Sequence, residues 1–285
     1  MKIGVDSFIW SEFFSEKDLW IIPKAKELGF CVVDIAIARP EQFPTAKVKE
    51  TAQKTGIPLI TSTTLNNSTN LISPDPEIRK RGVASMKLLI DINREIGSNL
   101  IGGMTYAAWG YLTGKPRTQQ EWDWSVAAMR EIAQYAKDTS DVTITVECAQ
   151  RFETHFLNVA ADAVAYCKDV GYDNLKVHLD SFHMIREELS FEDAILACGK
   201  QYLGYMHLCE SNRGIPGTGM VPWERLFRAL KAIDYQGYAV IESFDTNFTE
   251  LVGNCAIWRK FADSGEQLAV QGLANLSKIL ADMKY

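Results

Sequence analysis

The chain alternates, from one end to the other, between short runs of β-branched and other apolar residues and longer amphipathic runs. The short runs have the length and composition of buried strands. They predict strands at about residues 2–9, 30–36, 59–64, 99–104, 142–147, 175–180, 203–207 and 238–242. The longer runs predict helices, and repeated strand–helix units are typical of a parallel sheet covered by helices. The sequence therefore predicts an α/β fold in which residues 1–285 form a single (β/α)8 TIM barrel domain.

Local signals mark where several of the predicted helices begin. Asp75 before Pro76 suits an N-cap followed by proline at the first helical position. Thr118 and Glu121 form a capping box, and Ser190 suits the N-cap of a later helix. Other helices are predicted at about residues 17–28, 45–55 and 159–170 and from about residue 222, and a last helical region at 258–283 has Gly265 and Gly272 as candidate breaks.

Four consecutive predicted strands end on a residue that can bind a cation, in the order Glu147, Asp180, His207 and Glu242. In a TIM barrel all strands are parallel, so their carboxyl ends share one rim, and strands that follow each other in sequence are neighbours. A carboxylate at the end of a buried strand is costly to bury unless a cation meets it. Two glutamates, one aspartate and one histidine therefore predict a divalent-cation site at this rim.

Further polar residues follow the same strand ends: Glu153 after the fifth strand, His183 after the sixth and Arg213 after the seventh. We expect His183 and Arg213 to lie on loops above the rim. There, an imidazole and a guanidinium can hold a substrate oxygen that becomes negative in the transition state. Taken alone, His183 is equally consistent with helix capping, and Arg213 with an ion pair to Glu210 or Glu153.

Residues 105–117 predict a long loop with three aromatic residues, among them Trp109. Loops of this length usually have a function, so we expect this one to cover the site. An ordinary loop with buried aromatic side chains is the alternative. His178 is expected to point away from the Asp180 side of its strand or into the barrel wall.

The composition disfavours several classes of protein. A net charge of −6 argues against a general nucleic-acid binder, which needs a basic surface. The sequence has no run of about 18 apolar residues, so no membrane span is predicted, and residues 1–6 lack the apolar core of a signal peptide. The six cysteines form no CxxC pair and suit a reducing compartment. We therefore expect a cytoplasmic protein with neither a nucleic-acid nor a membrane partner.

Several short motifs in the sequence resemble those of a known enzyme family. They are Glu147-x-x-Gln-Arg-Phe-Glu153, His178-Leu-Asp180-Ser-Phe-His183-Met184, His207-Leu-Cys-Glu210-Ser-Asn-Arg213-Gly, Val240-Ile-Glu242-Ser-Phe and Ser7-Phe8-Ile9-Trp10. Together they resemble the ketose 3-epimerases, which act on D-tagatose, D-psicose (D-allulose) or L-ribulose, within the xylose-isomerase-like TIM barrel superfamily. The chain departs from the pattern at Gln150, where the family usually has asparagine. It also departs at Asp6, where several members have an aromatic residue that shapes the far end of the pocket.

The resemblance implies one divalent metal per chain, manganese in most members with Co²⁺ or Mg²⁺ as alternatives, bound by the residues that match the four strand-end ligands. It implies that the residues matching Glu153, His183 and Arg213 contact substrate oxygens, and we expect Trp109 to bind substrate as well. It also suggests a homodimer or homotetramer.

The implied reaction inverts C3 of a free ketohexose or ketopentose. Pairs of this kind are D-psicose/D-fructose, D-tagatose/D-sorbose and L-ribulose/L-xylulose. The C3 hydrogen is acidic because the C2 carbonyl takes up charge as a cis-enediolate, which a divalent metal stabilises as a Lewis acid. One carboxylate removes the proton, and a carboxylic acid on the other face returns one. Glu147 and Glu242 are the expected acid/base pair.

Three alternative functions fit parts of the pattern. An aldose–ketose isomerase of the hydroxypyruvate-isomerase type would share the barrel, the metal and the two glutamates, so the sequence does not separate it from an epimerase. An endonuclease-IV-like phosphodiesterase uses several zinc ions and many histidines, whereas this chain has four histidines and a net charge of −6. A non-catalytic sugar-binding barrel would not need a pair of glutamates.

Overall fold

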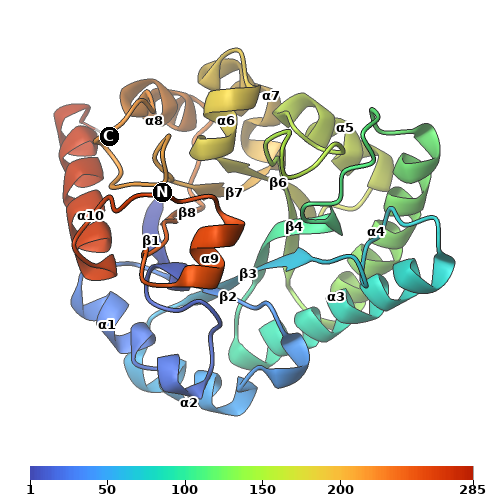
Figure 1. Cartoon of the computed structure of the whole chain (residues 1–285), viewed down its shortest axis with the longest axis horizontal. Helices are drawn as coiled ribbons and strands as arrows, with labels where there is room; N and C mark the ends of the chain where they lie inside the picture. Colours follow the sequence, from blue (N-terminus) through green and yellow to red (C-terminus); the bar gives the residue numbers. More distant parts are fainter. Residues whose placement is uncertain (285) are drawn as a thin grey trace.

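The computed structural model describes residues 1–284 and shows a closed barrel of parallel strands surrounded by helices (Figure 1). The strands pair in sequence order, and the first pairs with the last, with Lys2 beside Tyr238. They are β1 (Lys2–Asp6), β2 (Val33–Ala36), β3 (Leu59–Leu65), β4 (Leu100–Ala108), β5 (Thr143–Glu147), β6 (Leu175–Asp180), β7 (Leu203–His207) and β8 (Tyr238–Ile241). The predicted (β/α)8 barrel is confirmed, while the assignment of residues 1–285 to one domain stays a prediction.

The helices that cover the barrel follow the strands in turn. They are α1 (Ile21–Glu27), α2 (Thr45–Thr55), α3 (Pro76–Ile96), α4 (Gln119–Thr139), α5 (Ala160–Val170), α7 (Phe191–Tyr202), α8 (Trp223–Ala232) and α10 (Gly265–Asp282). The predicted caps are present: the side chains of Asp75, Thr118 and Ser190 each accept a hydrogen bond from a backbone N–H in the first turn of α3, α4 and α7. These short polar side chains compete well for the free N–H groups of a helix start.

Two short helices after strands β6 and β8 were not predicted. They are α6 (Ser181–Glu187) and α9 (Thr249–Asn254). The expected helix over 258–283 begins only at Gly265, and the N-terminal part of that range is not helical. Both short helices lie at the carboxyl-terminal end of the barrel strands, where inserted segments shape the sites of this fold.

Three predicted strand boundaries were wrong. Strand β1 ends at Asp6 because the Asp6 side chain accepts a hydrogen bond from the Phe8 N–H at 2.6 Å and starts a 3₁₀ turn over Ser7–Ile9. Strand β2 begins at Val33. Strand β4 continues to Ala108, so the loop expected from residue 105 is shorter, and every residue of β4 is buried.

The core consists of two clusters in and around the barrel and a third, formed by Phe244, Leu251 and Ile257, in the segment after β8. The larger cluster combines apolar residues of the strands with those of the surrounding helices. A smaller cluster consists of Val32, Ile60, Leu100, Tyr205 and Val240. The smaller cluster fills the interior of the barrel below the rim, because its residues lie in or beside five different strands and pack against each other. Within residues 1–284, no helix combines the length and apolar composition that a bilayer-spanning helix needs.

Candidate active site

The strand ends of β5–β8 bring the four predicted ligands together at the rim. Glu147, Asp180 and His207 are the last residues of their strands, and Glu242 directly follows β8. Asp180, His207 and Glu242 each offer one ligand atom, and these atoms lie within 4.8 Å of one another. Glu147 belongs to a second such group with Asp180 and His183. The geometry brings the predicted set together, and its role as a metal site stays a prediction.

The donor atoms suit a divalent cation. Asp180 Oδ2 and His207 Nδ1 are buried and have no hydrogen-bond partner among the described residues. An unsatisfied buried polar atom costs about 1–3 kcal/mol, which a cation between the two would offset. The other oxygen of Asp180 caps helix α6 by accepting from the Phe182 N–H at 2.7 Å, which orients the carboxylate. A set of carboxylates with one imidazole fits Mn²⁺, Co²⁺ or Mg²⁺.

The charges of this cluster depend on each other. Burial raises the pKa of Glu147 well above its usual range, and the nearby Glu242 carboxylate adds to the rise. Burial also acts to raise the pKa of Glu242, but His207 and Arg213 outweigh it and lower that pKa. Burial lowers the pKa of His207, yet the surrounding carboxylates raise it to about 10. His207 therefore carries positive charge in the chain without a cation, and a bound cation would replace that charge because ligands must be deprotonated.

Arg213 is a buried cation beside this cluster, with 5% of its surface exposed. Its Nη1 donates to Glu242 Oε2 at 2.5 Å, and its Nη2 lies 3.9 Å from Glu153 Oε1. The guanidinium stacks on the rings of Phe182 and Phe244, at 4.0 and 4.8 Å from their centroids. Its backbone has a φ of 59°, which few non-glycine residues adopt. The hydrogen bond to Glu242 and the two aromatic rings fix the orientation of the guanidinium beside the four predicted ligands.

Glu210 is not the partner of Arg213, contrary to one of the alternatives considered above. Its carboxylate accepts hydrogen bonds from the backbone N–H groups of Gly217 and Val221 at 3.0 and 3.1 Å. It also accepts from Trp223 Nε1 at 3.1 Å. Glu210 thus fixes the loop between β7 and α8, and Arg213 lies on that loop.

His183 lies on helix α6, not on a loop as expected. Its Nε2 is 3.6 Å from Glu147 Oε1 and 3.8 Å from Glu153 Oε2, and its Nδ1 accepts from the backbone N–H of Gln150 at 3.2 Å. Because Nδ1 accepts a hydrogen bond, Nε2 carries a proton that it can donate into the site. His183 is 3% exposed.

Glu153 and Trp109 lie together above the same rim. Trp109 Nε1 donates to Glu153 Oε2 at 2.9 Å, and Gln150 Nε2 donates to Glu153 Oε1 at 3.1 Å. The pKa of Glu153 is lowered, because His183 and Arg213 outweigh the effect of burial. The Glu153 carboxylate is therefore ionised, oriented and able to accept a substrate hydroxyl. Gln150, one of the departures from the family pattern, contributes to this orientation.

The six residues expected to act on substrate line one cavity of about 140 Å³, namely Trp109, Glu147, Glu153, His183, Arg213 and Glu242. A deeper cavity of about 60 Å³ shares Glu147 and Glu242 with it and adds His207. A wider hollow of about 740 Å³ leads outwards past Trp109 and Arg213. The rim therefore holds a small chamber that adjoins a wider hollow, and the two share Trp109, Glu153 and Arg213 in their walls.

Sequence reasoning missed most of the remaining wall of this chamber. Phe8 lines both inner cavities, whereas the fully buried Asp6 lines neither. Phe8 belongs to the Ser7–Trp10 motif, and this motif is the sequence signal that could have identified Phe8 as a cavity residue. Thr64 and Met104 add to the wall from β3 and β4. Helix α9 supplies Leu251 and Asn254, and no sequence pattern had marked them.

The expectation for His178 was wrong. His178 and Asp180 are two residues apart on β6, so their side chains share a face. The His178 ring points into the barrel, where its Nδ1 accepts from the Gly103 N–H at 3.2 Å and lies 4.0 Å from Glu147 Oε2. Burial lowers the pKa of His178 well below its usual value, so this ring is neutral.

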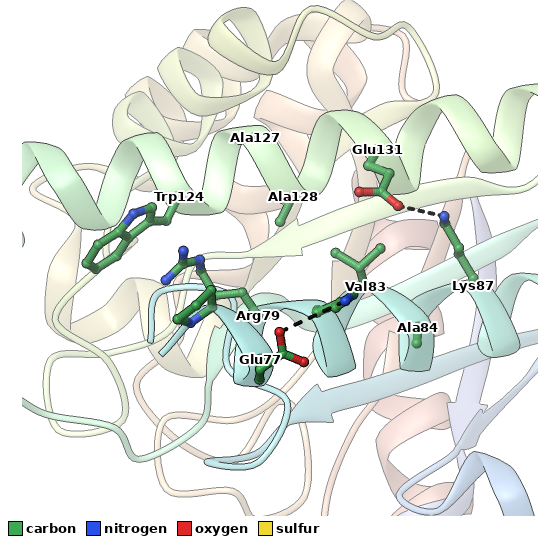
Figure 2. Close-up of a pocket in the computed structure, with 11 residues that line it drawn as sticks. Glu77, Arg79, Val83, Ala84, Lys87, Trp124, Ala127, Ala128 and Glu131 are labelled. Carbon is green, nitrogen blue, oxygen red and sulfur yellow. Dashed lines mark hydrogen bonds and ion pairs between the residues drawn. The ribbon is translucent and has the colours of Figure 1, made fainter. Parts of the chain in front are cut away.

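A hollow of about 610 Å³ also lies outside the barrel, between helices α3 and α4 (Figure 2). Arg79 stacks over the ring of Trp124 at 4.5 Å, and Lys87 pairs with Glu131 at 2.7 Å. None of the strand-end residues lines it. Its charged side chains are exposed or half-buried on two helix surfaces, and each of these contacts lies far from the strand ends in sequence, so the candidate site remains at the rim.

Comparisons with known proteins found similarity along almost the whole chain. Residues 22–279 match a family model described as xylose isomerase-like TIM barrel. The chain is 32% identical over 270 residues to a D-psicose 3-epimerase from Agrobacterium fabrum, which covers 93% of each chain. It is 32% identical over 262 residues to an L-ribulose 3-epimerase from Mesorhizobium japonicum, which covers 90% of this chain and 87% of the relative. A crystal structure of D-allulose 3-epimerase from Methylomonas sp. in complex with D-allulose superposes with a TM-score of 0.93 and 31% identity, covering 98% of this chain and 96% of the other.

Proposed function

We propose ketose 3-epimerase activity for this chain, which belongs to the xylose isomerase-like TIM barrel family and is a carbohydrate epimerase. The proposed substrates are free ketohexoses and ketopentoses, in line with the names of the relatives. One observation carries the proposal. Two glutamates from different strands, Glu147 and Glu242, line the same small cavity as a buried guanidinium and a buried imidazole.

The two glutamates have different neighbours, which suits a proton-transfer pair. Glu242 accepts a hydrogen bond from Arg213, whereas Glu147 faces His183 at 3.6 Å. The contact with Arg213 favours the ionised form of Glu242, and it contributes to the lowered pKa of that carboxyl. Within the described part of the chain, Glu147 has no such partner, and burial raises its pKa. We assign Glu147 and Glu242 to opposite faces of C3, where one removes the proton and the other returns one, with the roles exchanged in the reverse reaction.

The proposed metal ligands are Glu147, Asp180, His207 and Glu242, and the proposed ion is Mn²⁺, with Co²⁺ or Mg²⁺ as alternatives. The unpaired, buried Asp180 Oδ2 and His207 Nδ1 support this assignment. When bound, the ion supplies a Lewis acid that stabilises negative charge on the substrate oxygens beside C3.

Four further residues are proposed to hold the sugar. Arg213 and His183 present N–H donors where the substrate oxygens gain negative charge, and such donors are most effective when held rigidly. The Glu153 carboxylate, oriented by Trp109, accepts from a substrate hydroxyl. Trp109 also lines both the inner cavity and the outer hollow, so it forms one wall of the entrance.

We also propose a homodimer or homotetramer, a cytoplasmic location, and a small sugar as the only partner class besides the chain itself. Large apolar side chains at Leu189, Met220 and Trp258 are exposed, which supports contact with another copy. All six cysteines are free, which supports a reducing compartment.

The test is incubation of the chain with Mn²⁺ and a panel of ketopentoses and ketohexoses in D₂O, followed by chromatography and NMR. A 3-epimerase produces the C3 epimer with deuterium at C3 and with C1 unlabelled. An isomerase of the hydroxypyruvate-isomerase type would instead produce an aldose and label C1 or C2. Deuterium found only at C1 would overturn the proposal.

A further inference from the structure

We propose that Asp34 and Tyr205 form a positioning pair that holds the His207 ring with Nδ1 towards the cation. This inference rests on the proposed metal function, and it concerns two residues below the rim that do not line the cavities described above. Asp34 lies on β2, and Tyr205 and His207 lie on β7. All three side chains have no more than 2% of their surface exposed.

The contacts form a chain with one arrangement of hydrogens. The Tyr205 hydroxyl donates to Asp34 Oδ2 at 2.5 Å, because a carboxylate only accepts. Because the phenol proton is already donated to Asp34, the Tyr205 oxygen can only accept from His207. The imidazole N–H at Nε2 is therefore the donor of the 3.1 Å hydrogen bond to that oxygen. His207 Nε2 also lies 3.5 Å from Asp34 Oδ2. The Tyr205 oxygen and Asp34 Oδ2 both face Nε2 as acceptors, so a neutral His207 ring carries its proton on Nε2.

That arrangement leaves the lone pair on Nδ1, where the cation site needs it. Nδ1 has no hydrogen-bond partner among residues 1–284 and lies 3.5 Å from Glu242 Oε1. A carboxylate that accepts from the other ring nitrogen of a metal-binding histidine fixes its tautomer and raises its basicity. The low dielectric of the barrel interior strengthens both hydrogen bonds. Asp34 and Tyr205 thus act on the metal through His207 without touching it.

Packing around the pair restricts the rings to this geometry. The His178 ring lies 4.4 Å from the Tyr205 ring and 4.3 Å from the His207 ring, centroid to centroid. A Cβ at Gly102 would lie 2.7 Å from Tyr205 Cε1, so a glycine is needed there for the tyrosine to fit. The site therefore has a preformed place for a tyrosine hydroxyl between Asp34 and His207.

The experiment measures Mn²⁺ affinity by titration calorimetry without any sugar, in the wild type and in Tyr205→Phe, Asp34→Asn and Asp34→Glu. We expect Tyr205→Phe to weaken Mn²⁺ binding by about 10- to 100-fold, the usual effect of losing such a partner. Asp34→Asn should weaken binding by at least as much, because its amide can donate to Nε2 and favour the wrong tautomer. Asp34→Glu keeps a carboxylate and should retain more affinity than Asp34→Asn.

Tyr166→Phe is the matched control. Tyr166 is also fully buried, but its hydroxyl pairs with Ser125 Oγ at 2.7 Å, between helices α4 and α5. Its loss should leave the Mn²⁺ affinity unchanged. If the Asp34–Tyr205 pair only packs the barrel, Tyr205→Phe and Asp34→Asn would both lower the melting temperature of the metal-free chain without a specific loss of Mn²⁺ affinity, and that result would overturn the inference.

A second readout reports the tautomer directly. Long-range ¹H–¹⁵N NMR of the chain loaded with diamagnetic Mg²⁺ should show His207 protonated on Nε2 and not on Nδ1, and the chain has only four histidines to assign. Protonation on Nδ1 in the loaded wild type would overturn the inference. A wild type that binds no divalent cation would overturn the proposed metal function together with it. Normal binding with unaffected variants would overturn the positioning pair alone.

Discussion

Replacing Arg213 by methionine removes the buried cation that faces Glu242 while keeping most of the side-chain volume. Arg213 is 5% exposed and its charge is paired with Glu242 at 2.5 Å. Removing one partner of a buried pair costs about 3–5 kcal/mol, because the other charge stays buried without compensation. We expect a loss of this size in the free energy of unfolding of the metal-free chain. The loss should be smaller with metal bound, because the cation then compensates Glu242.

The same replacement should lower kcat/KM by about 100- to 1000-fold, the effect of losing one rigid donor to a developing negative charge. The metal content should stay near one per chain, since Arg213 is not an assigned ligand. Conversion of a ketose is followed by chromatography, the metal by elemental analysis, and stability by urea unfolding with and without chelator. Arg225→Met is the control: Arg225 pairs with Glu192 on the exposed surface, and such pairs contribute about 0–1 kcal/mol.

The stability loss should depend on pH. The folded-state pKa of Glu242 is lowered, so its ionisation stabilises the folded chain above its unfolded pKa of about 4.3 and this contribution disappears as the pH falls through the folded value. The deficit of Arg213→Met should therefore be largest near neutral pH and shrink in acid. Loss of metal from this variant, or a kcat/KM within about threefold of the wild type, would refute the role of Arg213 as a substrate-binding donor.

The other predictions concern the metal, the acid/base pair and the barrel interior. Prolonged chelation should abolish turnover and lower the melting temperature, since the ion binds only the folded state. Addition of Mn²⁺ or Co²⁺ should restore both turnover and melting temperature. Full activity of a preparation that elemental analysis shows to be metal-free would contradict this prediction. His183→Ala should lower kcat/KM by about 10- to 1000-fold with unchanged metal content, and loss of metal would make His183 a ligand. Glu147→Gln and Glu242→Gln should each lower turnover by several orders of magnitude. One of the two variants can still exchange the C3 proton of one epimer in D₂O, because the remaining glutamate serves one face of C3. Near-normal turnover of Glu242→Gln would exclude the two-glutamate mechanism. Gly103→Ala should destabilise the chain by about 2 kcal/mol or more, because its φ is +94° and a Cβ would lie 2.1 Å from the Thr63 carbonyl oxygen; an unchanged urea midpoint would contradict this.

The parts of the fold that were predictable depend on local signals. Strands β5, β6 and β7 end at Glu147, Asp180 and His207 as expected, because each apolar run stops at a polar residue. The start of α4 was predictable from Thr118 and Glu121, which satisfy each other across one turn. The barrel closure then followed from the number of units, since parallel strands with helical crossovers share one rim.

The parts that were missed depend on contacts between distant residues. Asp34 and Tyr205 are 171 residues apart, and neither strand shows that its side chain meets the other inside the barrel. The extension of β4 to Ala108 was missed because Tyr106 was grouped with Trp109 and Tyr111, which follow the strand, into one aromatic loop. Helix α9 has weak helical periodicity over only six residues, so its contribution to the cavity wall was not visible in the sequence.

The proposed ligands all come from the β5–β8 arc of the barrel, whereas Phe8, Thr64 and Met104 line the cavity from the β1, β3 and β4 side. This division gives directed evolution two separable targets. A mutant library confined to those three positions would change the shape of the cavity while every proposed metal ligand stays in place. If the proposed function holds, selection for new ketose substrates can therefore begin at Phe8, Thr64 and Met104 without altering any of the four proposed ligands.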